Sequence, residues 1–227
     1  YTSTYETQAA KVLFLKGISM SKVEETYWEK RRDKSTKEIS YLYAIKYPFP
    51  AKELKSMVYE FEKRDKEMYR KFTDLEEAYA SVSSVEQIDR AVNDLKPLID
   101  YFFDDVRKNA ARNLQANYKK LYVNIMFQVS SNRLGRHVFA LMLDGREITT
   151  SQRPALTSDE ASQLQMNAEG THYVVTYDYS GSEYDAENSV NVRFMFGGKA
   201  VTHKFYYTVT RQRVDIEPHK TAYLTAN

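Results

Sequence analysis

Residues 25–47 read ETYWEKRRDKSTKEISYLYAIKY, and this stretch decides how the first part of the chain folds. Its second half alternates two sets of side chains, which is the period of two of a β-strand. A second candidate strand covers 23–29, and the polar stretch 31–37 connects the two. Residues 12–20 are a candidate for a third strand. Prolines 48 and 50 end the pattern, so the sequence predicts a small β-rich module over residues 1–49.

One side of the later strand carries a row of aromatic and β-branched residues: Ile39, Tyr41, Tyr43, Ile45 and Tyr47. Such a row is typical of the core side of a small sheet. With the basic turn at 31–37 it also resembles a stacking surface for nucleic-acid bases. Acidic residues interleave with the basic ones and cancel most of the positive field. We therefore expect a core wall, and nucleic-acid binding through the turn stays the less favoured alternative.

Residues 50–120 change to a helical period. Leu54, Phe61, Met68 and Leu75 recur every seven residues, with Asp65 as the one break in the companion positions. The stretch SVSSVEQ at 81–87 interrupts the pattern and supplies a capping box for a second helix. That helix carries its own seam, which includes Phe102 and Val106. The pattern predicts a long antiparallel helical hairpin whose second helix is kinked at Pro97 and extends as far as Lys120.

Period two returns over residues 121–227. The predicted elements are a strand at 121–129, a hairpin turning at Asp144-Gly145, a strand at 173–177 and a hairpin turning at Gly197-Gly198. Six or seven such strands predict an immunoglobulin-like β-sandwich with a C-terminal tail. The predicted fold class is therefore α+β and multi-domain. It combines the β-rich module, the helical hairpin and the sandwich.

Composition narrows the function classes. The 227 residues are 42% hydrophobic and 28% charged, with a net charge of +2, so the chain lacks the overall basic field of a dedicated nucleic-acid binder. The absence of cysteine excludes disulfides, thiol nucleophiles and thiolate zinc sites. No apolar run approaches the ~20 residues that a membrane-spanning helix needs.

Residues able to carry chemistry are scattered. His172 and His203 could form a metal pair if their strands were neighbours, although half-exposed strand histidines are the favoured interpretation. Asp104 and Asp105 point about 100° apart on a helix, so they do not form an acid–base pair. The acidic loop 178–188 is a candidate calcium loop but is better interpreted as solvated. With no nucleophile elbow or phosphate loop, we expect no catalytic residues, no metal and no cofactor.

The stretch VEETYWEKRRDKSTKEISYLYAIKYPFPAKELKSM at 23–57 resembles the closing hairpin of a bacterial envelope lipoprotein module. That module is related to the N-terminal domain of the flagellar T-ring assembly protein. In this family a strand with an aromatic residue, a polar turn and an aromatic-rich strand precede a short helix start. Here Tyr27 and Trp28, then 41–45, then 52–54 would take those parts. The resemblance covers residues 10–57 and implies a periplasmic or surface lipoprotein, anchored upstream of Tyr1.

We therefore expect a non-enzymatic cell-envelope protein that acts as a structural or interaction module, with the helical hairpin as spacer and the sandwich as contact domain. Its expected partner is another envelope protein, with no nucleic acid. A glycan- or peptide-binding module is the first alternative. The loops at 150–163 and 178–188 are the expected contact surfaces on the sandwich. The candidate binding residues are Tyr27, Trp28, Tyr41, Tyr43, Asp178, Glu183 and Asp185.

Overall fold

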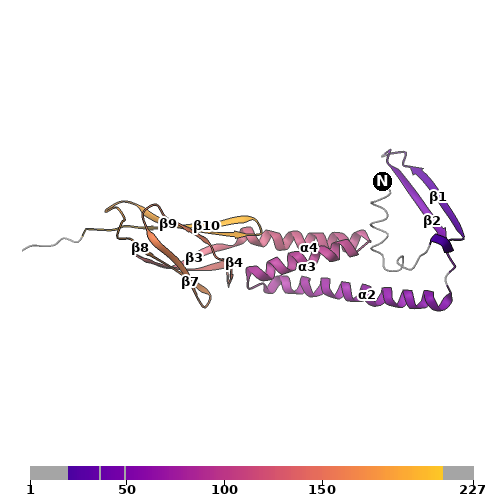
Figure 1. Ribbon diagram of the computed structural model, residues 1–227, viewed down its shortest axis with the longest axis horizontal. Helices are drawn as coiled ribbons and strands as arrows, with labels where there is room; N and C mark the ends of the chain where they lie inside the picture. The colour runs from indigo at the N-terminus through magenta and orange to yellow at the C-terminus, as the bar shows by residue number, and fades with distance from the viewer. Residues whose placement is uncertain (1–19, 36, 49, 212–227) are drawn as a thin grey trace, which may run out of the picture. The chain divides into compact units, whose positions relative to one another are not determined.

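The computed structural model describes residues 20–35, 37–48 and 50–211 (Figure 1). Backbone packing divides the chain into two compact units. The first unit takes the residues up to 81 together with 91–116, and the second takes 82–90 together with the residues from 117 onward. The third strand predicted within 12–20 falls almost entirely outside the described residues, so its outcome stays open.

The first unit begins with a short 3-10 helix, η2 (Met20–Lys22), and the antiparallel hairpin of β1 (Glu25–Arg32) and β2 (Ile39–Lys46). Asp33 organises the connection between the strands. Its carboxylate accepts the backbone N–H of Ser35 at 2.7 Å and the Ser35 hydroxyl at 2.6 Å. Aspartate favours such turns because its side chain can cap a backbone N–H two residues on. The hairpin predicted at 25–47 is therefore present.

The predicted long antiparallel helical hairpin is wrong, because the described chain has three helices. These are α2 (Ala51–Ala78), followed by the 3-10 turn η3 (Tyr79–Ser81), then α3 (Val85–Tyr101) and α4 (Asp105–Asn124). Helix α3 ends at Tyr101. The Asp104 side chain then accepts the Arg107 backbone N–H at 2.9 Å and caps the start of α4. Because α4 is a separate helix, its side chains do not continue the apolar face of α3. Phe102 is buried, while Val106 of the same predicted seam is 81% exposed.

Asp65, the one break in the first apolar seam, has a partner. Both of its carboxylate oxygens accept from Nη1 of Arg107, at 2.9 and 2.8 Å. The same guanidinium donates through Nε to Asp104, and its face lies 5.0 Å from the ring centroid of Phe102. The polar residue thus belongs to a charge cluster that joins α2 to the start of α4. Asp104 belongs to this cluster through its two hydrogen bonds with Arg107.

In its described residues, the second unit combines 82–90 and the end of α4 with eight strands in two sheets. The prediction of an immunoglobulin-like sandwich of six or seven strands is therefore wrong in its strand number and arrangement. The broader prediction of an α+β fold is compatible with the described chain. The five-stranded sheet runs β3-β4-β8-β7, with β5 paired to β4, and the three-stranded sheet runs β10-β9-β6. The strands are β3 (Met126–Arg133), β4 (Arg136–Leu143), β5 (Arg146–Ile148), β6 (Ala155–Thr157), β7 (Ser162–Glu169), β8 (His172–Asp178), β9 (Asn188–Phe196) and β10 (Lys199–Tyr207).

The start of this region differs from its prediction as a strand from 121. Residues 121–124 complete α4, and β3 begins only at Met126. Leu121 and Tyr122 are both buried although they are adjacent, as is Tyr118 one turn earlier. Adjacent residues point to opposite faces of a strand, but they can share a broad helix face. The hairpin turns predicted at Asp144-Gly145 and Gly197-Gly198 are both present, with positive φ at all four residues.

Aromatic side chains fill the space between the two sheets. Phe139 of β4 packs against Phe194 of β9 and Phe205 of β10, with ring centroids 6.5 and 5.7 Å apart. Tyr173 of β8 adds a stacked contact to Phe139 at 5.4 Å. All four side chains are buried. Their size gives this core a large hydrophobic contribution together with specific ring geometry.

Glu86 fixes the first turn of α3 to the strands of the second unit. Its carboxylate accepts the Thr150 hydroxyl at 2.9 Å, the Ser151 backbone N–H at 2.7 Å and the Ser151 hydroxyl at 3.0 Å. Beside it, Ser84 and Thr149 form a parallel β-bridge. Asp89, one turn further, accepts the phenol of Tyr122 at 2.5 Å. Hydrogen bonds therefore connect the start of α3 to residues 150–151 and to the end of α4.

No helix in the described ranges is both long enough and apolar enough to span a lipid bilayer.

We predict that Gly197→Ala destabilises the protein far more than Gly198→Ala. Gly197 has φ +54°, and a Cβ there would clash with the buried Tyr122 ring, whereas a Cβ on Gly198 meets open space. Both variants incur left-handed backbone strain of about 1 kcal/mol. Gly197→Ala adds an overpacking cost of about 1–3 kcal/mol. Urea unfolding measures both, and equal losses of stability would contradict the clash.

His137 is a buried polar residue whose hydrogen-bonding groups are unused. Its ring is stacked between Tyr177 and Phe205, with centroids at 5.2 and 4.7 Å, and it is fully buried. Neither ring nitrogen has a hydrogen-bond partner, and the same holds for the Tyr177 hydroxyl. Burial lowers the pKa of His137 to about 4, and His203 adds a smaller repulsion. The folded protein therefore holds a neutral imidazole.

Because His137 is buried as a neutral imidazole, the protein is predicted to become less stable as the pH is lowered from 6.5 to 4. In the unfolded chain this histidine is protonated below about pH 6.5, whereas in the folded protein it is protonated only below about pH 4. The free energy of unfolding is therefore at its full value above pH 6.5 and decreases as the pH is lowered below it. The loss attributable to His137 reaches about 3 kcal/mol at the acid end. His137→Phe should be more stable than the parent at pH 5. The control variant His172→Gln, at a half-buried position of β8, should retain the parental pH slope in urea titrations, and a parental slope in His137→Phe would contradict the assignment.

Candidate functional site

The register of the β1–β2 hairpin sorts its side chains onto two faces. Trp28 pairs with Tyr43, Lys30 with Tyr41 and Arg32 with Ile39. Directly paired residues project to the same side of an antiparallel sheet, and successive residues project to opposite sides. These six residues together with Thr26 and Ile45 make up what we call the aromatic face. The ionic face is the other side: Glu25, Tyr27, Glu29, Arg31, Ser40, Leu42, Ala44 and Lys46.

The aromatic face is open to solvent. Trp28 is 67% exposed, Tyr43 is 62% exposed and Tyr41 is 57% exposed. Ile39 is exposed as well, and Ile45 is half-buried. The expectation that this row forms the wall of a core is therefore wrong for the described structure, although Ile39, Tyr41, Tyr43 and Ile45 do share one face. Clustered exposed aromatic rings mark interaction surfaces more often than they mark inert surface.

The charges are divided unequally between the two faces. On the ionic face Arg31 pairs with Glu29 at 3.0 Å and Lys46 pairs with Glu25 at 3.2 Å. The hydrogen bond from Arg31 holds the pKa of Glu29 below its usual value. The aromatic face has no carboxylate at all.

The two cations of the aromatic face have no ion-pair partner among the residues that the structure describes. Lys30 Nζ lies 5.8 Å from the centroid of the Tyr41 ring, a cation–π distance, and neither Lys30 nor Arg32 forms an ion pair with a described carboxylate. The aromatic face is therefore suited to a negatively charged ligand that also has a flat or apolar surface.

The structure brings three of the predicted site residues together and separates the others. Trp28, Tyr41 and Tyr43 share the aromatic face, whereas Tyr27 lies on the ionic face and donates to Glu29 at 3.3 Å. Sequence reasoning missed Lys30, and it placed Arg32 in the polar connection 31–37, whereas Arg32 is the last residue of β1. Their even spacing from Trp28 within one strand was the signal that could have placed them beside the rings.

The acidic loop between β8 and β9 belongs to the second unit. Asp178 accepts the Ser180 backbone N–H at 2.9 Å, which lowers the pKa of its carboxyl. The Asp185 N–H donates to the Val209 carbonyl at 2.9 Å, and the Glu183 carbonyl accepts from Asn188. These bonds order the loop itself. Whether Asp178, Glu183 and Asp185 bind a partner stays a prediction.

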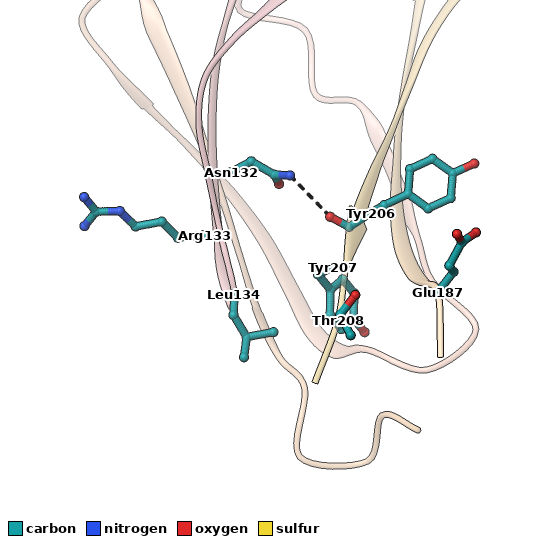
Figure 2. A pocket seen from close by; sticks show the side chains of 7 residues that line it. All are labelled: Asn132, Arg133, Leu134, Glu187, Tyr206, Tyr207 and Thr208. Atoms are coloured by element: carbon teal, nitrogen blue, oxygen red, sulfur yellow. Dashed lines mark hydrogen bonds between the residues drawn. The ribbon is translucent and has the colours of Figure 1, made fainter. Parts of the chain in front are cut away.

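A cleft of about 370 Å³ lies at the ends of β3 and β10 (Figure 2). The Asn132 side chain donates to the Tyr206 carbonyl at 3.4 Å across it. The Arg133 guanidinium points away from the other labelled side chains in Figure 2. Its charged groups, Arg133 and Glu187, therefore do not converge on one point. The other lining residues are Leu134, Tyr207 and Thr208.

The candidate histidine pair is not assembled. His172 belongs to β8 of the five-stranded sheet, where its ring lies 4.0 Å from a Glu147 oxygen. His203 belongs to β10 of the other sheet and stacks on Phe127 at 5.3 Å. Within the described ranges, no three His, Asp or Glu side chains gather as a metal site would require.

Comparison of the chain with family models, with curated proteins and with solved structures finds no match.

We predict that the fluorescence of Trp28, the one tryptophan of the chain, is readily quenched by acrylamide in the folded protein. Its 67% exposure should give a quenching constant of at least about half that of the urea-unfolded chain. A titration in both states measures the ratio. Strong shielding that disappears on unfolding would contradict an open aromatic face.

Proposed function

We propose that this chain is a non-enzymatic contact protein and that the aromatic face is its binding surface. One observation carries the proposal: the hairpin register places three exposed rings on the same side as two cations that pair with no described carboxylate. Tryptophan, tyrosine and arginine are the residues that contribute most to binding energy at interfaces. An isolated two-stranded hairpin is also only marginally stable in water, so a bound partner would stabilise it.

The cell envelope is the proposed location. The resemblance of residues 10–57 to the envelope lipoprotein module suggests it. The order of elements supports it: an aromatic-bearing strand, a polar turn, an aromatic-rich strand and then α2 beginning at Ala51. Expression from the native gene start, followed by membrane fractionation and mass spectrometry of the mature N-terminus, tests the location. A soluble, unprocessed product would contradict it.

Cross-linking from defined positions tests the contact function. A photoreactive residue at Tyr43 should give a discrete adduct in cells that express the native gene, because Tyr43 lies on the aromatic face. The same residue at Leu42 should give far less, because this adjacent position of β2 lies on the ionic face. Mass spectrometry then identifies the adduct. Equal labelling from both positions, or no adduct from Tyr43, would contradict the proposal.

A further inference from the structure

We infer that the aromatic face binds an acidic polysaccharide, a chain of sugar rings that carry carboxylate groups. The inference rests on the proposed contact function and specifies its ligand. It is carried by the order of side chains along the face, by its charge and by the density of that charge.

The face consists of successive cross-strand pairs. Trp28 with Tyr43 is followed by Lys30 with Tyr41 and then by Arg32 with Ile39. Neighbouring pairs on one face are two residues apart, about 7 Å along the strand. One side of a pyranose ring presents C–H groups and packs flat on an aromatic ring, as apolar groups do on the faces of Trp and Tyr. An extended ligand with repeating rings therefore matches a face on which stacking positions lie next to charged positions.

Charge complementarity requires the ligand to be anionic. The aromatic face has two cations and no carboxylate. Lys30 has the exposed ring of Trp28 on one side along its strand and that of Tyr41 opposite it. A second copy presenting the same face would oppose like charges, which disfavours self-association. A neutral glycan would use the rings but leave Lys30 and Arg32 without partners.

The density of charge favours a polysaccharide over a nucleic acid. Nucleic-acid binding draws its affinity from neutralising many closely spaced phosphates, and single strands are bound along basic grooves. This face offers two cations, and the chain as a whole carries a net charge of +2. A uronic-acid chain has one carboxylate for each sugar ring, which two cations can match over a short stretch.

The experiment uses labelled oligogalacturonate and the full chain. Fluorescence anisotropy should report saturable binding, and unlabelled oligomer should change the emission of Trp28. The methyl-esterified oligomer, which has the same rings without the charges, should bind at least tenfold more weakly. Raising the salt concentration should weaken binding of the acidic form, because the cations are exposed to solvent.

Variants on the aromatic face, each with a control on the ionic face, locate the site. Trp28→Ala should weaken binding at least tenfold, whereas Tyr27→Ala, on the ionic face, should not. Lys30→Gln with Arg32→Gln should weaken binding and reduce its salt dependence. Arg31→Gln with Lys46→Gln, which removes two positive charges from the ionic face, should leave both nearly unchanged. The glutamine variants keep every ring, so they remain informative if Trp28→Ala perturbs the hairpin.

Three results would overturn the inference. Tighter binding of an oligothymidylate of equal charge at the same salt would assign the face to nucleic acid. No response to the acidic oligomer, together with persistent cross-links from Tyr43, would remove the polysaccharide and leave the contact function standing. Shielding of Trp28 in the free chain would remove both proposals. Concentration-dependent shielding would then identify a second copy as the occupant, and concentration-independent shielding would identify other residues of this chain.

Discussion

The second unit depends on one carboxylate at the start of α3. Glu86 accepts three hydrogen bonds from Thr150 and Ser151, which connect the first helical turn to the segment between β5 and β6. Partial burial alone would raise the pKa of this carboxyl, but the hydrogen bonds that Ser151 and Thr150 donate outweigh it and lower the pKa. Together with the bridge between Ser84 and Thr149, Glu86 fixes where the helix begins. The polar stretch 81–87 is therefore an anchoring segment rather than a simple turn between helices.

The first unit depends on a different constraint, the strict alternation of side chains in a strand. In the β1–β2 hairpin both glutamates of β1 are odd-numbered, and so is Arg31, while Trp28, Lys30 and Arg32 are even-numbered. The register then aligns the even positions of β1 with the odd positions of β2. A slip by one residue would place the glutamates opposite the tyrosines and neutralise the face. The asymmetry of charge is thus a direct consequence of register.

Sequence reasoning succeeded where a local rule decides the structure. The hairpin at 25–47 and the tight turns at Asp144-Gly145 and Gly197-Gly198 follow from alternation and turn chemistry. It failed at the helices, because an apolar seam continues in the sequence across 102–104 while the cap at Asp104 starts a new helix. It identified Trp28, Tyr41 and Tyr43 but misjudged their burial. Whether a row of rings is covered depends on tertiary packing, which alternation alone does not contain.

The same row of rings could belong to a core wall or to a binding face, and the cations distinguish the two. A wholly apolar partner would bury Lys30 and Arg32 without a counter-charge. The free energy cost of burying an unpaired charge is far larger than the gain from burying an aromatic ring. Side chains at the rim of a covered face can extend to water. Lys30, however, lies within the row, between Trp28 and Arg32 on its own strand and opposite Tyr41. Whatever covers this face must therefore bring anions to the middle of it, so apolar contact alone does not define the partner.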